Sequence, residues 1–124
     1  MSAGDTLATS RAVASRSHRS PALERVLAEL RCPSVVALGS AGLKGAAIAQ
    51  GDAEIYVGPG MAGKRWDVCA VEAIVNGAGG RYTDARGLPF DYRAPSLTNE
   101  HGILATNGLL HDAVLDGLTR AGLR

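Results

Sequence analysis

The stretch "GPGMAGKRWD", residues 58–67, brings together residue types that could bind a nucleoside triphosphate or a metal ion. Gly58, Gly63 and Lys64 have the spacing of a P-loop, in which backbone N–H groups surround the phosphates. A P-loop also needs Ser or Thr after the lysine, because that hydroxyl binds Mg²⁺, and Arg65 occupies this position. No later strand ends in a convincing second metal-binding aspartate. We therefore interpret the glycines as a strand-to-helix turn that tolerates positive φ.

Asp67 is the second candidate, because it follows Trp66 in the first turn of a predicted helix. A carboxylate at this position can cap the helix and stabilise it by roughly 0.5–1 kcal/mol. It can also hold Mg²⁺ while the free N–H groups of the helix receive a phosphate. Both roles use the same geometry, so the residue pattern leaves both open.

A second predicted helix begins within "GSAGLKG", residues 39–45, with Ser40 as its cap and Lys44 in its first turn. A cation at a helix N-terminus opposes the helix dipole, unless an anion binds nearby. The position of Lys44 therefore indicates a phosphate or carboxylate site. The alternative is a solvated lysine on a surface helix.

The loop "SRSHRS", residues 15–20, places Arg16, His18 and Arg19 among three hydroxyl groups. Such a cluster could contact a phosphate or stack on a base. It could equally be a polar turn.

The remaining polar residues favour structural roles. His101 and His111 have no spacing to a second metal ligand, so we expect surface or hydrogen-bonded structural histidines. Asp84 and Asp91 flank a predicted turn and are typical turn formers. No Ser/His/Asp or Cys/His order suggests a covalent nucleophile.

Composition limits the class of protein. The chain has 124 residues with 13 basic and 12 acidic side chains, which favours one small domain without a nucleic-acid-binding surface. Cys32 and Cys69 lack CxxC spacing, so we expect small core residues in a reducing compartment. We see no secretory signal in the first dozen residues and no apolar segment approaching the roughly 20 residues of a membrane span. A cytoplasmic location is the expectation.

Helical and strand patterns alternate along the chain, which predicts a mixed α/β sheet with packed helices. We expect a disordered or strand-like N-terminal segment over 1–14 and one domain over 15–124. Helices are predicted at 21–31, within 39–51, at 66–80 and at 109–123; strands at 34–38, 53–57 and 102–106; and a hairpin from 81–84 and 89–92. In the third helix, the expected apolar face consists of Trp66, Ala70, Ala73, Ile74 and Ala78.

Four stretches together resemble a known family: "SRSH", "GSAGLKGAAIAQGDAEIYV", "KRWDVCAVEAIVNGAGGRYTDARGLPFDY" and "GILATN". They resemble the C-terminal half of the inositol monophosphatase superfamily of sugar phosphatases, over residues 12–120. The WD–helix–GG–strand signature marks the superfamily. The "SRSH" loop and the Lys44 motif favour its 3′(2′),5′-bisphosphate nucleotidase branch, the CysQ-type enzymes.

The resemblance implies a role for each candidate residue. Asp67 would bind Mg²⁺ beside the scissile phosphate. Ser15, His18 and the Ser40–Lys44 segment would hold the nucleotide, and at Ser40 a backbone contact is expected. Ser15 stands where the branch often has Thr and keeps the hydroxyl. The implied reaction converts 3′-phosphoadenosine 5′-phosphate to AMP and phosphate.

The chain departs from the superfamily pattern in lacking the motifs of its N-terminal half. These motifs are a metal-binding Glu, a "DP-x-D-G-T"-type sequence and the residue that activates water. One carboxylate cannot hold two or three Mg²⁺ ions, each of which needs several oxygen ligands. We therefore expect a fragment or one half of a split enzyme, with a missing N-terminal half as partner. Alone, it should turn over far more slowly than about 1 per second.

Two other functions stay open. The first is an inositol-phosphate phosphatase, although the "SRSH" loop argues against it. The second is a non-catalytic nucleotide- or anion-binding module, which AMP binding by the isolated chain would support. We expect no such binding, because half of a fold exposes an apolar face that normally packs on its partner.

Overall fold

The structure is a computed structural model that describes residues 1–15, 20–60, 64–93 and 98–124. In chain order its elements are η1 (Leu7–Thr9), β1 (Arg11–Ser15), α1 (Pro21–Leu30), β2 (Ser34–Leu38), α2 (Ala41–Gln50), β3 (Ile55–Gly58), η2 (Arg65–Asp67), α3 (Cys69–Gly77), β4 (Arg81–Thr83), β5 (Ile103–Thr106) and α4 (His111–Arg120). The predicted α/β class is confirmed. None of the helices within the described ranges is long and apolar enough to cross a membrane.

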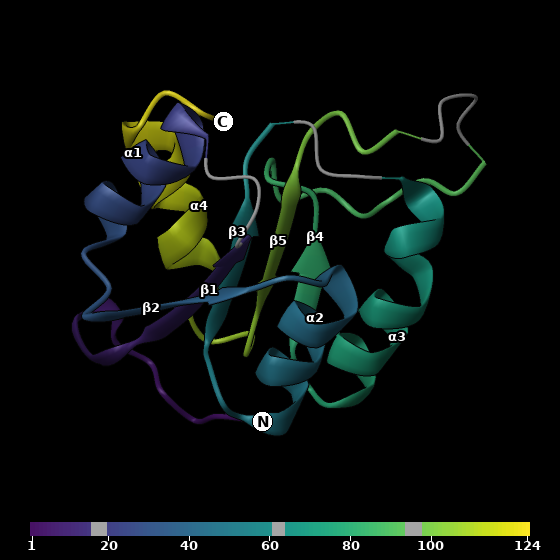
Figure 1. The fold of residues 1–124 in the computed structure, drawn as a ribbon, viewed down its shortest axis with the longest axis horizontal. Helices are drawn as coiled ribbons and strands as arrows, with labels where there is room; N and C mark the ends of the chain where they lie inside the picture. The colour runs from purple at the N-terminus through teal and green to yellow at the C-terminus, as the bar shows by residue number, and fades with distance from the viewer. Residues whose placement is uncertain (16–19, 61–63, 94–97) are drawn as a thin grey trace.

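The five strands form one sheet in the order β2-β1-β3-β5-β4 (Figure 1). β1 pairs in parallel with both β2 and β3, and β5 pairs antiparallel with β3 and β4. The strand-like alternative for the N-terminal segment is therefore right for residues 11–14. β1 runs across the expected boundary between residues 14 and 15.

Helices cover both faces of the sheet because its strands alternate apolar residues toward each side. One core contains residues of α1 and α4 together with Ala12, Ala14, Ile55, Val57 and Leu104 of the sheet. The other contains residues of α2 and α3 together with Val13, Tyr56, Tyr82, Ile103 and Ala105. In Figure 1, α1 and α4 lie together at one side of the molecule, and α2 and α3 lie together at the other.

Serine caps begin both α1 and α2, as the sequence predicts. The Ser20 hydroxyl accepts a hydrogen bond from the Leu23 N–H at 3.1 Å. The Ser40 hydroxyl accepts from the Gly42 N–H at 3.1 Å and from the Leu43 N–H at 3.4 Å. These bonds satisfy N–H groups that have no partner within the helix.

Glycines allow the helices of each layer to approach closely. A Cβ atom at Gly45 in α2 would lie 2.0 Å from Cγ1 of Val71 in α3. In the other layer, a Cβ atom at Gly117 in α4 would lie 2.6 Å from Cδ2 of Leu30 in α1. Both distances are shorter than any normal contact. Each helix pair can therefore approach this closely only because glycine has no side chain.

The predicted apolar face of the third helix is not its buried face. Trp66 and Ile74 are 65% and 54% exposed, and the other members of that face are exposed as well: Ala70, Ala73 and Ala78. The buried residues are instead Val68, Val71 and Val75. The segment offers two apolar stripes, and contact with Gly45 of α2 selects the valine stripe. The chain also enters the helix through η2, so that α3 begins only at Cys69.

The predicted hairpin of 81–84 with 89–92 is also wrong. β4 pairs with β5, and residues 89–92 form no strand. The turn itself exists, because the Asp84 carboxylate accepts hydrogen bonds from the Arg86 and Leu88 N–H groups at 2.8 and 3.0 Å. After the turn, Phe90 is buried in the core rather than paired along an edge. The wholly buried β5 supplies the pairing partner that a local pattern cannot reveal.

The expectation of two core cysteines is wrong for Cys69, which is exposed at the first residue of α3. Cys32 is half-buried, packs against the α1/α4 core and accepts a hydrogen bond from the Ser10 hydroxyl at 3.3 Å. Both thiols are free.

Candidate functional site

Lys44 occupies an enclosed position at the N-terminal end of α2. Its side chain is buried, with the residue only 5% exposed. The Nζ atom lies 5.3 Å from the centroid of the Tyr56 ring and 3.4 Å from the carbonyl oxygen of Leu38, to which it donates a hydrogen bond. The ammonium group thus contacts the last residue of β2 and a tyrosine ring of β3. This geometry excludes the alternative of a solvated surface lysine.

The charge of Lys44 is poorly compensated. Burial lowers its pKa, because removal from water disfavours the ammonium form. Among the described residues, no carboxylate forms an ion pair with it. The carbonyl of Leu38 and the face of Tyr56 supply partial negative charge, but no full anion. An anionic ligand beside Lys44 would therefore be favoured.

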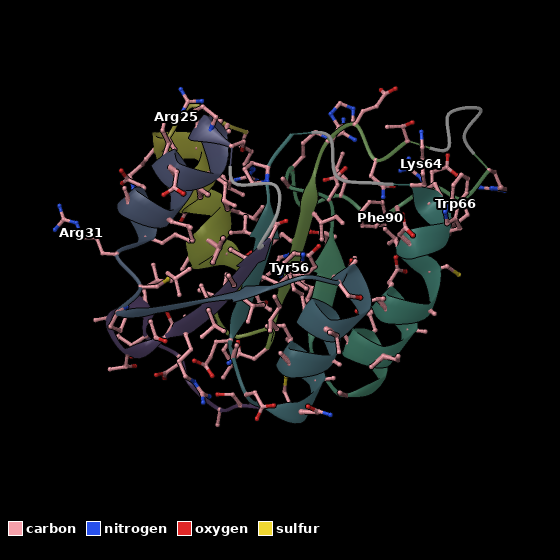
Figure 2. All side chains as sticks on the ribbon, in the orientation of Figure 1. Arg25, Arg31, Tyr56, Lys64, Trp66 and Phe90 are labelled. Atoms are coloured by element: carbon pink, nitrogen blue, oxygen red, sulfur yellow. The ribbon has the colours of Figure 1, made fainter. Side chains whose placement is uncertain are left out.

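Asp67 lies in η2 with an exposed side chain, and its Oδ2 accepts a hydrogen bond from the Lys64 N–H at 3.1 Å. It therefore caps the short η2 helix, as one of the two predicted roles requires. Burial raises the pKa of Tyr56 to about 12, and the negative charge of Asp67 adds to this effect. Tyr56 thus interacts electrostatically with both Lys44 and Asp67. Figure 2 shows Tyr56 at the centre of the molecule.

The donor set around Asp67 accounts for only part of a metal site. Mg²⁺ prefers near-octahedral oxygen ligands, usually one or two carboxylates together with water and substrate phosphate. Asp67 supplies one exposed carboxylate beside the start of α3. Within the described ranges, His, Cys, Asp and Glu side chains nowhere gather in a group of three or more that could hold a metal ion. Asp67 therefore has the donor chemistry of one metal ligand, and a complete Mg²⁺ site would need further oxygen ligands.

The other predicted nucleotide-binding residues lie near Lys44 where the structure describes them. Ser15 ends β1 directly opposite Leu38, whose carbonyl accepts from Lys44. The hydroxyl of Ser40 is used as the cap of α2, which leaves its backbone for any ligand contact. His18 lies outside the described residues. Because β1, β2 and β3 are parallel, their carboxyl ends bring Ser15 and Lys44 to one edge of the sheet.

The cations that follow the glycine turn contact another part of the chain. Lys64 donates through Nζ to the Thr98 hydroxyl at 2.8 Å. Arg65 donates to the side chain of Asn99 and, at 3.2 Å, to the carbonyl of Asp91. These contacts support the rejection of a P-loop, although Gly63 lies outside the described residues.

A pocket of about 270 Å³, which the sequence did not predict, adjoins η2. Its lining contains none of the predicted site residues: Arg65, Asp84, Arg86, Pro89, Phe90, Asp91, Thr98, Asn99, Glu100 and His101. The guanidinium group of Arg86 pairs with Asp84 at 2.9 Å, and that of Arg65 bonds to Asn99. The strongest donors of this pocket are therefore already used within the chain.

The sequence analysis did not identify two tyrosines of the α2/α3 core as candidate site residues. Tyr56 supplies the ring beneath Lys44. The Tyr82 hydroxyl is buried, and within the described part of the chain it has no hydrogen-bond partner. In the sequence Tyr56 lies in the apolar run of residues 55–57 and Tyr82 lies between Arg81 and Thr83, so nothing in the pattern distinguishes either from an ordinary strand residue.

The predicted structural roles of the histidines and aspartates are confirmed. His111 is fully buried, and its Nε2 and Nδ1 lie 2.8 and 2.9 Å from the hydroxyls of Thr83 and Thr106. Burial, aided by the charge of Arg81, lowers the pKa of His111 to about 4. His101 is exposed. Asp91, like Asp84, accepts from a turn N–H, in its case that of Arg93 at 2.9 Å.

Comparison with known proteins gives relatives of one kind. The sequence model of the inositol monophosphatase family matches residues 2–119. The chain is 34% identical over 91 residues to 3'(2'),5'-bisphosphate nucleotidase 1 of Rattus norvegicus, which covers 73% of this chain and 30% of that protein. It is 42% identical over 55 residues to inositol monophosphatase 3 of Xenopus laevis, covering 44% of this chain and 15% of that protein. The structure resembles the inositol monophosphatase of Anabaena with a TM-score of 0.75 and 26% identity, covering 96% of this chain and 48% of that one.

The Anabaena match extends over nearly all of this chain, the rat match over 73% of it and the Xenopus match over 44%, and each covers less than half of the relative. The chain spans about 30% of the rat nucleotidase and about half of the Anabaena structure. The names of these relatives are those of inositol monophosphatases and of a bisphosphate nucleotidase. The sequence, the fold and the match over residues 2–119 agree, and the chain belongs to the inositol monophosphatase family.

Proposed function

We propose that the chain is the part of a Mg²⁺-dependent phosphomonoesterase that binds the nucleotide and contributes one metal ligand. The preferred substrate is a 3′(2′),5′-bisphosphate nucleotide such as 3′-phosphoadenosine 5′-phosphate, with AMP and phosphate as products. The cytoplasm is the proposed location. Without the other ligands of the metal, the chain alone has negligible activity.

The observation that carries this proposal is the buried ammonium group of Lys44. It has a lowered pKa and lies over Tyr56, without a carboxylate partner among the described residues. A phosphate bound there would supply the missing negative charge. The N–H groups at the start of α2 would add to the attraction, because a helix N-terminus favours anions.

Each residue then has a distinct task. Lys44 holds a phosphate of the substrate, and Ser15 contributes a hydroxyl at the same edge of the sheet. The backbone at Ser40 contributes donors, and His18 contacts the nucleotide. Asp67 holds the metal, which when bound neutralises phosphoryl charge and activates water. The similarity to the rat nucleotidase supports the choice of a bisphosphate nucleotide.

The test measures phosphate release from 3′-phosphoadenosine 5′-phosphate with Mg²⁺. The 124-residue chain alone should show almost none, and the same chain completed by the missing half of the fold should be active. Asp67→Asn in the complete protein should lower activity at least a hundredfold, since the neutral amide binds metal poorly. Turnover by the chain alone of about 1 per second or more contradicts the proposal.

An inositol phosphate is the second candidate substrate. The similarity to inositol monophosphatase 3 of Xenopus laevis, 42% over 55 residues, favours it. A complete protein that hydrolyses inositol phosphates faster than bisphosphate nucleotides would replace the nucleotide assignment while leaving the reaction class intact.

A non-catalytic binding module is the third candidate. Calorimetry with AMP separates it from an enzyme half. Binding by the isolated chain, together with no activity of the complete protein, would favour the module.

A further inference from the structure

Asn99 lies in the segment that leads into β5, and its polar side chain is buried. The residue is only 1% exposed. Its Nδ2 donates a hydrogen bond to the carbonyl oxygen of Lys64 at 2.9 Å, and its Oδ1 accepts a hydrogen bond from Nη1 of Arg65. Burying an amide is costly unless its donor and its acceptor are paired. Both bonds of Asn99 end on the two residues at the start of η2.

The two residues that Asn99 contacts lead directly to Asp67. Lys64 precedes η2, and Arg65 is its first residue. The N–H of Lys64 donates to Oδ2 of Asp67 at 3.1 Å, and the carbonyl oxygen of Lys64 accepts from the N–H of Asp67 at 3.0 Å. Lys64 therefore fixes both the backbone and the carboxylate of Asp67. Asn99 in turn fixes Lys64 through the same carbonyl oxygen.

The segment that carries Asn99 is attached to the sheet. The carbonyl oxygen of His101 accepts a hydrogen bond from the N–H of Ala85, just after β4, at 2.8 Å. Gly102 has a φ of +74°, and a Cβ atom there would lie 2.5 Å from the carbonyl oxygen of Gly58, the last residue of β3. These two contacts tie the segment to the ends of β3 and β4. Asn99 thus transmits the position of the sheet to the start of η2.

The other contacts of this turn are more exposed. Lys64 donates through Nζ to the Thr98 hydroxyl, and Arg65 donates through Nε to the carbonyl of Asp91, and both bonds face water. The two bonds of Asn99 are partly buried, where a hydrogen bond is electrostatically stronger. A short 3₁₀ turn such as η2 also has poor hydrogen-bond geometry of its own. In Figure 2, Lys64 lies in the same corner of the view as Trp66 and Phe90.

We propose that Asn99 is a positioning residue that orients Asp67 for metal binding. The inference rests on the proposed function and deepens it, because it names a residue that sets the direction of the metal ligand without touching the metal. An exposed carboxylate loses rotamer freedom when it binds a metal, and prior orientation lowers this cost. Removing a residue that orients a metal ligand typically weakens metal binding by about 10- to 100-fold.

Asn107 offers a matched control at the other end of β5. It is 4% exposed, its Nδ2 donates to the carbonyl oxygen of Gly4 at 2.7 Å, and its Oδ1 accepts from the N–H of Leu109 at 3.2 Å. Both asparagines are buried and use both ends of the amide, but Asn99 contacts the residues before Asp67. A loss confined to the Asn99 variant therefore reports orientation of Asp67 rather than general stability.

The first measurement uses the 124-residue chain without metal. NMR couplings between the Hα and Hβ atoms of Asp67 should report a single rotamer. Asn99→Ala should bring them to the average over several rotamers, and Asn107→Ala should leave them unchanged. Asn99→Asp keeps the shape of the side chain and its contact with Arg65, but has no donor for the carbonyl of Lys64. It should also give averaged couplings, and it carries the test if Asn99→Ala does not fold.

The second measurement uses the chain completed by the missing half of the fold. Mn²⁺, which takes oxygen ligands as Mg²⁺ does, is titrated and followed by electron paramagnetic resonance. Asn99→Ala should weaken Mn²⁺ binding by roughly tenfold or more, and Asn107→Ala by less than about twofold.

Three results overturn the inference: averaged Asp67 couplings already in the unmodified chain, unchanged couplings in both Asn99 variants, or equal weakening of Mn²⁺ binding by Asn99→Ala and Asn107→Ala. Other results separate it from the proposed function. Averaged couplings in the Asn99 variants, with a completed protein that neither binds Mn²⁺ nor releases phosphate, support the orientation of Asp67 and contradict the function. Phosphate release by a completed protein whose Mn²⁺ affinity is unaffected by Asn99→Ala contradicts the inference and supports the function.

Discussion

The two helical layers that cover this small sheet differ in the residues that they expose. Both rest on the same five strands, and both bring their helices together through a glycine, Gly117 between α1 and α4 and Gly45 between α2 and α3. Yet the outer side of α1 and α4 is charged, whereas the exposed residues of α2 and α3 are not. Inner packing therefore does not reveal whether a layer faces water. Only the outer side does.

The buried polar groups show the same contrast. In α4, His111 has a hydroxyl beside each ring nitrogen. On the α2/α3 side, Lys44 lacks a counter-charge and the Tyr82 hydroxyl has no partner, among the described residues. Buried polar groups are normally paired. Among the described residues, the histidine of α4 has a polar partner at each ring nitrogen, whereas the α2/α3 side has a hydroxyl without a partner and an ammonium group paired only with a carbonyl.

The largest predicted effect tests whether the α1/α4 layer is complete. An unfolded histidine titrates near pH 6.5, whereas His111 in the fold has a pKa of about 4. The unfolded chain therefore binds more protons between these values, and stability is lost as the pH falls from 6.5 to 4, by up to about 3 kcal/mol. Urea unfolding across this range measures the loss.

His111→Gln serves as its control, because it should flatten the slope over this pH range whatever its effect on overall stability. An unchanged slope in the His111 variant would contradict the assignment.

The second largest predicted effect comes from a substitution that disrupts the packing between α2 and α3. Gly45→Ala places a methyl group 2.0 Å from Val71, and the strain should lower the free energy of unfolding by about 2 kcal/mol. Gly42→Ala, three residues earlier on the same helix, meets only the Ser40 hydroxyl at 3.5 Å. This control should be neutral or stabilise by about 0.5 kcal/mol through helix propensity. Equal effects of the two changes in urea unfolding would show that the helices do not pack closely.

The third effect separates stability from ligand binding at Lys44. Lys44→Met removes a buried charge that has no anionic partner among the residues that the structure describes, so the chain should become more stable by about 1 kcal/mol at pH 7. The complete protein should at the same time bind AMP at least tenfold more weakly by calorimetry. Lys64→Met, at an exposed lysine, should not increase stability. A destabilised Lys44→Met chain would show that the ammonium is already compensated.

The smallest effect concerns the charged side of the α1/α4 layer. Glu29 and Arg120 pair at 2.7 Å, but both side chains are well exposed. Arg120→Gln should therefore lower the free energy of unfolding by about 0.5 kcal/mol at low salt, and less at high salt. A double-mutant cycle with Glu29→Gln measures the pair directly. A coupling above roughly 1 kcal/mol would mean that this surface is more buried than the structure indicates.

Most local structure could be predicted from the sequence. Ser20 and Ser40 cap their helices because a hydroxyl before a helical run accepts the first free N–H groups. The strand at 34–38 and the end of α2 at Gly51 follow from equally local signals, β-branched residues and a left-handed glycine. The structure places Ser15 and Lys44 at one end of the sheet. The roles of Ser15, His18, Ser40, Lys44 and Asp67 stay predictions.

The failures share one physical cause. Trp66 and Ile74 fit a helical stripe as well as Val68 and Val71 do, so helical periodicity alone could not choose between the two faces. The partner of β4 likewise lies some twenty residues away in β5 rather than in the adjacent segment. Long-range packing decides both, and a local pattern contains no information about it.

By itself the sequence determined the α/β class, the helix caps, the family and the residues that could bind phosphate and metal. Those properties depend on side-chain chemistry and on neighbours a few positions apart. Only the tertiary structure decided that Lys44 is buried over Tyr56, that the valine stripe of α3 faces the core, and that Trp66 and Ile74 are exposed to solvent. These properties arise where segments distant in the chain compete for the same contact, and free energy is minimised over the whole fold rather than over each segment.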